Sequence, residues 1–292
     1  MKWNDYREHW SHPELSQFIK VRPHNWHIQD SGEENLPSIL LIHGTGASTH
    51  SWRLLIPILR KKFRVVAVDL PGHGFTTLGS SNRSGLDFIA QDLASLLEDQ
   101  KIRPSLVIGH SAGAAIAIRY NMDYRRDLMG IISLNGVFDQ YFDGIASFIY
   151  PFFAKLLSIN PLTGAVIAKF NKSTRQIKRL SEITGSKIDS KSLFFYEELF
   201  SNPQHLTGTL TMMSQWKLTK LLNDLSSLNT NILLLAGEND KMVTPKVQKD
   251  YHHKLKNSSL MTLESLGHLM HEEAPILISE HIFSFYKKLI HS

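Results

Sequence analysis

The sequence predicts an α/β fold, in which a mostly parallel sheet carries helices on both faces. Short apolar runs alternate with helix-length amphipathic segments, which is the pattern of strands joined by crossover helices. The 292 residues are 42% hydrophobic and 20% charged, the composition of a globular protein with a sizeable core. The chain has no cysteine, so disulfides, thiolate metal sites and cysteine nucleophiles are excluded.

Six apolar runs are predicted to form strands of this sheet. The last of them is the least apolar, and we place it near the sheet edge. Nearly every run ends in a turn that contains glycine or an acidic residue, at the sheet edge where open α/β folds place their sites. The runs are Ser38–His43, Arg64–Asp69, Leu106–Gly109, Gly130–Asn135, Asn231–Ala236 and Ser259–Glu264.

The alternation stops between Phe138 and Leu228, where only helical segments broken by proline and glycine are evident. This stretch is rich in Phe, Tyr and Met, which is typical of a lid over the carboxyl edge of the sheet. We therefore expect a core made of residues 1–137 and 229–292, and a helical cap made of residues 138–228. A subdomain that merely packs its own small core is the alternative.

The strongest functional signal is the segment Gly109-His110-Ser111-Ala112-Gly113, which follows one predicted strand and precedes an Ala-rich helical segment. A serine at a sharp turn between a strand and a helix is lifted clear of the backbone, and only small neighbours permit that strained turn. The helix N-terminus then lies beneath the hydroxyl. This pattern predicts that Ser111 is a nucleophile.

A nucleophilic serine needs a base, and the base needs an orienting acid. In this architecture their chain order is serine, acid, histidine. His268 follows the last predicted strand and is the predicted base, whereas His271, His252 and His253 are interpreted as structural or solvated. Asp240 closes a very apolar strand and is the predicted acid. Glu238 and Asp139 are the alternatives.

An oxyanion needs two preorganised N–H donors. We expect one from the backbone of Ala112, directly after the nucleophile, and one from Thr45 in the turn Gly44–Gly46. A phosphate cradle is the alternative reading of this turn, but the turn lacks the Lys-Ser/Thr ending and the dinucleotide spacing.

Together these residues resemble the α/β-hydrolase superfamily. That resemblance implies an eight-stranded, mostly parallel sheet with a helical cap insertion, and it implies neither a metal nor an organic cofactor. A closer resemblance is to the magnesium-chelatase accessory hydrolases of bacteriochlorophyll synthesis. It is carried by Trp26–Gln29, His43–Arg53, Asp69–Thr76, Gly109–Ile116, Leu156–Pro161, Thr184–Asp189, Met212, Met213, Trp216 and Gly267–Glu273.

The first functional hypothesis is a serine hydrolase that acts on a carboxylic ester of an apolar substrate, with a thioester or a C–C bond as variants. Aspartate-nucleophile relatives, the epoxide hydrolases and dehalogenases, are disfavoured because residue 111 is serine. The second hypothesis is a tetrapyrrole-binding or scaffold protein with little catalysis. For either ligand the predicted substrate contacts are Gly44, His110, Phe152, Met213 and Trp216.

The net charge of +5 is mild, but its distribution is uneven. Residues 169–187 carry six basic side chains against Glu182 alone, which indicates a solvated helix face or a contact with an anionic membrane or protein partner. Nothing indicates a nucleic-acid partner. No apolar run reaches the roughly 18 residues of a membrane span, and no apolar segment follows the charged N-terminus. We therefore expect a cytoplasmic protein that contacts a membrane at most peripherally.

Overall fold

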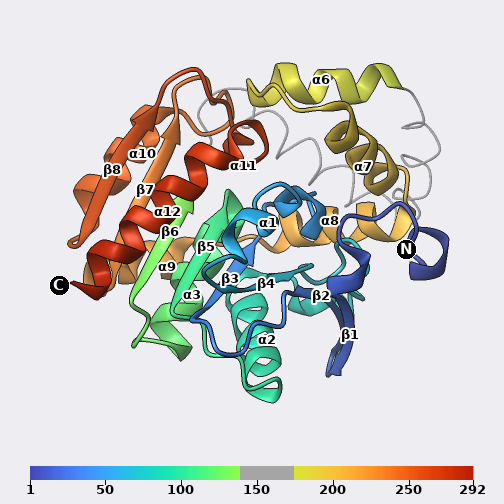
Figure 1. Cartoon of the computed structure of the whole chain (residues 1–292), viewed down its shortest axis with the longest axis horizontal. Helices are drawn as coiled ribbons and strands as arrows, with labels where there is room; N and C mark the ends of the chain where they lie inside the picture. Colours follow the sequence, from blue (N-terminus) through green and yellow to red (C-terminus); the bar gives the residue numbers. More distant parts are fainter. Residues whose placement is uncertain (139–173, 292) are drawn as a thin grey trace.

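The computed structural model describes residues 1–138 and 174–291, and its centre is a single eight-stranded sheet (Figure 1). The strand order is β1-β2-β4-β3-β5-β6-β7-β8. Strands β3 to β8 run parallel to one another, and β2 is antiparallel to both β1 and β4. The strands are β1 Ser16–Val21, β2 His24–Asp30, β3 Ser38–Ile42, β4 Arg64–Val68, β5 Leu106–His110, β6 Gly130–Leu134, β7 Asn231–Gly237 and β8 Ser258–Leu263.

All six predicted strands are present within one or two residues of their expected bounds, and β8 lies at the sheet edge as expected. The sequence analysis missed β1 and β2. Strand β1 is largely exposed, and β2 buries the polar residues His24, His27, Gln29 and Asp30. Neither strand therefore shows the apolar run by which the other six were identified.

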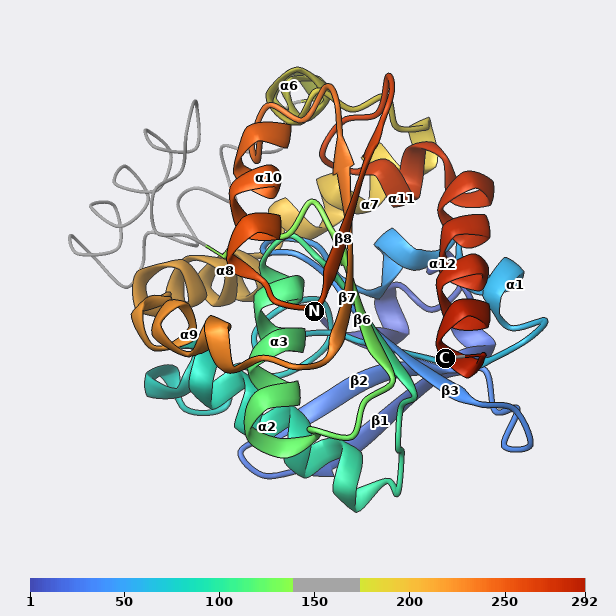
Figure 2. The same ribbon diagram turned by 90° about the vertical axis from the view of Figure 1, so that its left-hand side faces the viewer.

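Helices cover both faces of the sheet (Figure 2). The α-helices are α1 Ile56–Leu59, α2 Leu86–Asp99, α3 Ala112–Tyr124, α6 Thr174–Thr184, α7 Ser190–Phe200, α8 Pro203–Gln215, α9 Thr219–Asp224, α10 Pro245–Lys254, α11 Met270–Glu273 and α12 Pro275–Ile290. The 3-10 helices are η1 Trp3–Asp5, η2 Pro13–Leu15, η3 Thr49–Trp52, η4 Ser81–Arg83 and η5 Leu225–Ser227.

Each central strand contributes alternate side chains to two separate cores, because successive residues of a strand point to opposite faces. In β3, Leu40 and Ile42 pack with α2 and α3, whereas Ile39 and Leu41 pack with α1 and α12. Both faces of these strands are therefore buried, which explains why they read as continuous apolar runs.

Helices α6 to α9 lie between β6 and β7 in the sequence, and residues 174–228 contain no strand. Helix α8 packs directly on the turn that follows β4: a Cβ atom on Gly208 would lie 2.2 Å from the carbonyl oxygen of Gly72. The cap boundaries at residues 138 and 228 stay predictions.

Helix α7 docks on α11 through a buried carboxyl group. The hydroxyl of Tyr196 donates to Glu272 Oε1 at 2.8 Å, and both side chains are buried. Burial raises the pKa of Glu272 to about 7, against the lowering effects of the Ser192 and Tyr196 hydrogen bonds and the Arg53 charge. Below about pH 7 the folded protein therefore holds this carboxyl group mainly in its neutral form.

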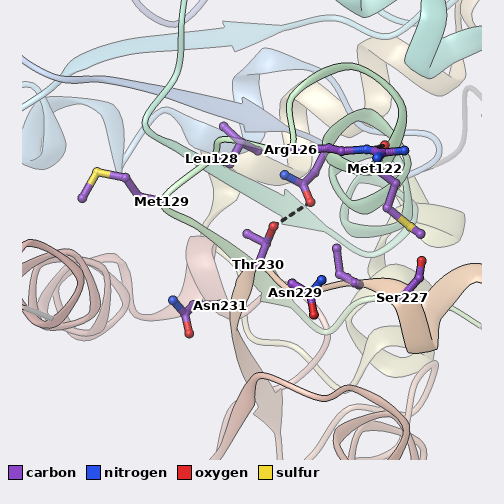
Figure 3. A pocket seen from close by; sticks show the side chains of 10 residues that line it. Met122, Arg126, Leu128, Met129, Ser227, Asn229, Thr230 and Asn231 are labelled. Carbon is purple, nitrogen blue, oxygen red and sulfur yellow. Dashed lines mark hydrogen bonds between the residues drawn. The ribbon is translucent and has the colours of Figure 1, made fainter.

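A cavity of about 460 Å³ lies at the amino ends of β6 and β7 (Figure 3). Its lining includes Met129, which precedes β6, and Asn231, which begins β7. Because Ser111 follows the carboxyl end of β5, which is parallel to β6, this cavity is at the opposite edge of the sheet.

None of the helices within the described ranges is both long and apolar enough to cross a bilayer.

The Glu272 carboxyl predicts a specific dependence of stability on pH. Between the ordinary pKa of 4.5 and the raised value of about 7, the folded state holds a proton that the unfolded state has lost. Stability therefore falls as pH rises through this window and is level above it. Glu272→Gln keeps the acceptor for Tyr196 but cannot ionise, so its stability relative to wild type should rise by about 2–3 kcal/mol between pH 4.5 and pH 8.

Urea unfolding at both pH values measures this difference. Glu264→Gln removes the same charge from an exposed position at the end of β8 and is the matched control. An equal response of the two variants would contradict the assignment.

Candidate active site

The segment Gly109–Gly113, which we call the elbow, forms a sharp turn between β5 and α3. Ser111 has φ 52° and ψ −120°, a strained conformation for a residue with a side chain. A Cβ atom on Gly109 would lie 2.4 Å from the carbonyl oxygen of Gly113, and a Cβ atom on Gly113 would lie 2.2 Å from that of Ile42. The two glycines therefore permit the close packing that holds Ser111 at the N-terminus of α3.

The turn Gly44–Gly46, which we call the oxyanion turn, lies directly against the elbow. A Cβ atom on Gly44 would be 2.9 Å from His110 Nδ1 and 3.0 Å from Ser111 Cβ. Among the described residues, none accepts a hydrogen bond from the backbone N–H of Thr45 or of Ala112. The predicted oxyanion donors thus flank Ser111 and are available to a ligand.

His268 and Asp240 are in direct contact, as the sequence analysis requires of a base and its acid. His268 Nδ1 lies 2.8 Å from Asp240 Oδ2, and both side chains are buried. Asp240 Oδ1 also accepts the backbone N–H groups of Met242 and Val243, at 2.7 and 2.9 Å. These contacts fix the carboxylate and leave Nε2 of His268 free of the acid.

Glu238, one alternative acid, is exposed and accepts the backbone N–H of Ser265. The other alternative, Asp139, lies outside the described residues. No hydrogen bond joins Ser111 to His268 in the described structure; such contacts commonly tighten only when a substrate is bound.

Residues Gly267–Leu269, which we call the base turn, are held by side chains from several elements. Asn135, which follows β6, donates through Nδ2 to the carbonyl oxygens of Gly267 and His268, both at 3.0 Å. Its Oδ1 accepts the N–H of Gly237, at the end of the strand that leads to Asp240. Asn135 therefore connects the end of β7, which leads to Asp240, with the base turn that carries His268.

No role in the site was predicted for Asn135. It is fully buried with φ 47°, and neither property can be read from the sequence. Its one sequence signal is its place directly after the apolar run of β6, at the sheet edge where such folds place their sites.

The ring of His110 is buried beneath the base turn. His110 Nε2 lies 2.9 Å from the carbonyl oxygen of His268, so this nitrogen is the donor. Burial, followed by the neighbouring His271 and His268, holds the pKa of His110 well below its ordinary value. Burial also lowers the pKa of His271 to about 3. Both rings thus remain neutral near pH 7, and His110 supports the base turn without adding charge.

None of the other histidines named in the sequence analysis is hydrogen-bonded to Asp240 in the described structure. His271 is buried in α11 against Trp52 and His110. His252 and His253 lie on α10, where His253 is exposed and His252 contacts Ser258.

The oxyanion turn is fixed from helix α8 by His205, which the sequence analysis also missed. His205 Nδ1 accepts the N–H of Gly74 at 3.0 Å, and Nε2 donates to the carbonyl oxygen of Gly46 at 3.1 Å. Burial, reinforced by the nearby His73, keeps the pKa of His205 well below its ordinary value. A neutral imidazole with one donor and one acceptor matches these two partners.

The predicted substrate contacts are only partly placed. Gly44 and His110 lie at the elbow, whereas Phe152 lies outside the described residues. Met213 is half-buried on α8, and Trp216 packs against the core beneath α2 and α3.

Of the six basic side chains in residues 169–187, only Arg179 and Lys187 are described, and both are exposed. Within the described ranges, no group of three or more metal-ligating side chains is assembled.

Comparison with known proteins gives consistent results. The sequence model of the "alpha/beta hydrolase fold" family matches residues 37–275. The chain is 36% identical over 265 residues to the "Magnesium-chelatase 30 kDa subunit" of Rhodobacter capsulatus, covering 91% of this chain and 92% of that protein. It is 26% identical over 288 residues to "Epoxide hydrolase 4" of Homo sapiens, covering 92% and 78% of the two chains.

Solved structures share the fold. A putative lipase from Acinetobacter baumannii AYE superposes with a TM-score of 0.80 at 22% identity, covering 94% of this chain and 92% of that chain. The matching family model spans most of this chain, and the sheet, the elbow and the helices flanking them are those of that family. The chain therefore belongs to the alpha/beta hydrolase fold family.

Proposed function

We propose that this protein is a serine hydrolase that cleaves a carboxylic ester of an apolar substrate. Ser111 is the nucleophile, His268 the base and Asp240 the acid that orients it. The observation that carries the proposal is the 2.8 Å contact of His268 with Asp240, at the sheet edge where the elbow presents Ser111 at φ 52°.

The reaction follows from this arrangement. Ser111 Oγ attacks the ester carbonyl carbon while its proton moves to His268 Nε2, and the N–H groups of Ala112 and Thr45 donate to the resulting oxyanion. The C–O bond to the alcohol then breaks, and the alcohol leaves with the proton from His268. Water, deprotonated by the same imidazole, releases the acid and restores Ser111.

The second candidate function is a tetrapyrrole-binding or accessory role in magnesium-tetrapyrrole synthesis, with little catalysis. One specific observation favours it, the 36% identity to a protein named as a magnesium-chelatase subunit. In both readings we place the protein in the cytoplasm, with residues 169–187 facing an anionic membrane or protein partner. The intact Asp240–His268 contact gives the hydrolase the greater support.

A fluorophosphonate probe tests the nucleophile, with the labelled residue identified by peptide mass spectrometry. We expect wild type to be labelled at Ser111, and His268→Ala to be labelled there at least about 10⁴-fold more slowly, because the residues act as a unit. His253→Ala, which removes an exposed histidine from α10, is the control and should react like wild type. No label at Ser111 in folded wild type, together with tight binding of protoporphyrin IX, would favour the tetrapyrrole-binding function.

The substrate class is tested with p-nitrophenyl esters of increasing acyl length. An apolar pocket should favour longer chains by up to about 0.8 kcal/mol in kcat/KM per buried methylene. We expect Met213→Ala, on α8, to flatten this slope. Met129→Ala, in the cavity at the opposite sheet edge, should leave it unchanged. Equal activity of wild type on acetate and octanoate esters would refute the pocket.

Asn135→Asp tests whether the base turn needs the hydrogen bonds that the side-chain amide of Asn135 donates to it. Aspartate keeps an acceptor for Gly237 but loses the donor to the carbonyls of Gly267 and His268. We expect kcat to fall by about 10²-fold with KM nearly unchanged, because a small misplacement of the base acts on the chemical step.

Asn121→Asp is the matched control for this change. Asn121 is also a buried amide that donates to a carbonyl and accepts a hydrogen bond, but it lies at the opposite sheet edge. It should lose stability and keep kcat per folded molecule. The positioning role is excluded if the two variants lose kcat equally.

A further inference from the structure

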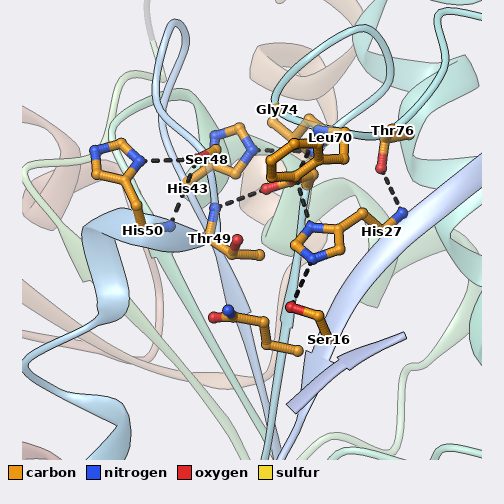
Figure 4. Close-up of polar contacts among 12 residues, drawn as sticks. Ser16, His27, His43, Ser48, Thr49, His50, Leu70, Gly74 and Thr76 are labelled. Atoms are coloured by element: carbon orange, nitrogen blue, oxygen red, sulfur yellow. Dashed lines mark hydrogen bonds and ion pairs between the residues drawn. The ribbon is translucent and has the colours of Figure 1, made fainter. Parts of the chain in front are cut away.

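A second serine, histidine and aspartate are joined by hydrogen bonds far from Ser111, in what we call the Ser16 relay. Ser16 Oγ lies 3.0 Å from His27 Nε2, and His27 Nδ1 lies 2.7 Å from Asp69 Oδ2. Figure 4 shows the serine and histidine on two adjacent strands, with a dashed line from the imidazole of His27 to the hydroxyl of Ser16. Unlike Ser111, this serine is already hydrogen-bonded to its imidazole.

Strand register brings the three side chains together. In the antiparallel pair of β1 and β2, Phe18 faces His27 and Ser16 faces Gln29. Ser16 is therefore the diagonal neighbour of His27 on the same sheet face, within reach of its ring. Asp69 directly follows β4, which pairs with β2, and its N–H donates to the carbonyl of His27 at 3.0 Å.

The carboxylate of Asp69 fixes the orientation of the imidazole. Asp69 is fully buried, its Oδ1 accepts the N–H of Thr49 at 2.7 Å, and its Oδ2 accepts the N–H of Phe75 at 2.9 Å. Burial alone would raise the pKa of Asp69, but its interactions with His27, His43 and the Phe75 N–H together outweigh burial and lower it. An ionised Asp69 accepts the hydrogen bond of the His27 Nδ1–H, so Nε2 of the neutral ring accepts from the Ser16 hydroxyl.

The surroundings of the Ser16 relay are apolar and partly open. The rings of Trp3, Phe18 and Phe75 lie 5.5, 5.2 and 5.1 Å from that of His27. His27 and Asp69 are fully buried, whereas Ser16 is only partly buried and Phe18 is 41% exposed. A small apolar reagent can therefore meet the hydroxyl while water has little access to the imidazole behind it.

We propose that Ser16 is a second nucleophile of this chain, one that accepts an acyl or phosphonyl group from small, activated apolar donors. Ser16 Oγ forms a bond to the acyl carbon or the phosphorus, and its proton passes to His27 Nε2. The bond to the leaving group, an aryl oxide or fluoride, breaks with its electron pair, and the leaving group takes the proton from His27 Nε2 and departs as the phenol or as HF.

The Ser16 relay acts independently of Ser111. Strands β2, β4 and β3 separate β1 from β5, which puts the two serines about 19 Å apart at the usual strand spacing of about 4.8 Å. One small donor cannot contact both.

The chain contains a reference serine that contacts a histidine but no carboxylate. Ser258 Oγ lies 2.8 Å from His252 Nδ1 and is partly buried, like Ser16, and its hydroxyl also lies 3.2 and 3.3 Å from the carbonyl oxygens of His252 and Leu255. Among the described residues, no carboxylate contacts His252. Ser258 is thus a serine paired with a histidine that lacks the orienting acid.

The experiment uses the full chain with Ser111→Ala, treated with diisopropyl fluorophosphate, and follows labelling of each serine by peptide mass spectrometry. We expect Ser16 to be labelled at least about 10²-fold faster than Ser258, the usual effect of a positioned base. His27→Gln should bring Ser16 down to the rate of Ser258, and Ser16→Ala should leave Ser111 labelling in an otherwise wild-type chain unchanged.

Similar rates at Ser16 and Ser258 in the folded protein would overturn the proposal. This comparison needs no substitution in the Ser16 relay, so it decides the question even if His27→Gln fails to fold. Because the site of labelling is mapped in a chain without Ser111, the result is also independent of the proposed hydrolase function.

Discussion

The close approach of α3 to β3 at Gly113 is the constraint on which the site depends. Only a hydrogen atom fits between Gly113 and the carbonyl oxygens of Ile42 and His43, since a Cβ atom would lie 2.2 and 2.7 Å from them. This contact places the N-terminus of α3 beside the turn that leaves β3. Ser111, Ala112 and Thr45 consequently meet, although more than 60 residues separate Thr45 from Ser111 in the sequence.

The turns at the carboxyl edge are held mainly by neutral polar side chains that bind backbone groups. Asn135 joins the strand that leads to Asp240 to the base turn, His110 supports the base turn from below, and His205 joins the oxyanion turn to helix α8. Burial keeps the pKa of both histidines low. Each ring is therefore a neutral hydrogen-bonding partner of the backbone, as an amide side chain would be. A charged residue at these positions would need a counter-ion that the site does not provide.

The sequence predicted those parts of the fold and site whose residues match their environment in an obvious way. Buried parallel strands read as apolar runs. Ser111 lies between Gly109 and Gly113, a spacing that indicates a tight turn. Strand β2 could not be found in this way, because His27, Gln29 and His24 are polar and yet buried. Their burial is compensated by partners distant in sequence, such as Asp69 for His27 and Asp92 for His24. Asn135 and His205 were missed for the same reason, since their partners are backbone atoms of other elements.

The two serines differ in their surroundings: Ser111 has N–H donors for an oxyanion beside it, and Ser16 has a hydrogen-bonded imidazole. Ser111 stands on a strained turn at the N-terminus of a 13-residue helix. The N–H groups of Ala112 and Thr45, which no described residue accepts, would donate to an oxyanion there. Ser16 lies at the start of a regular strand, and its own N–H is already donated to the carbonyl of Pro13. It has the oriented imidazole that removes a proton, but its backbone N–H cannot also bind an oxyanion. Because a second tetrahedral intermediate must form to release an acyl group, Ser16 should retain the group it accepts, whereas the proposed nucleophile Ser111 should release its acyl group to water.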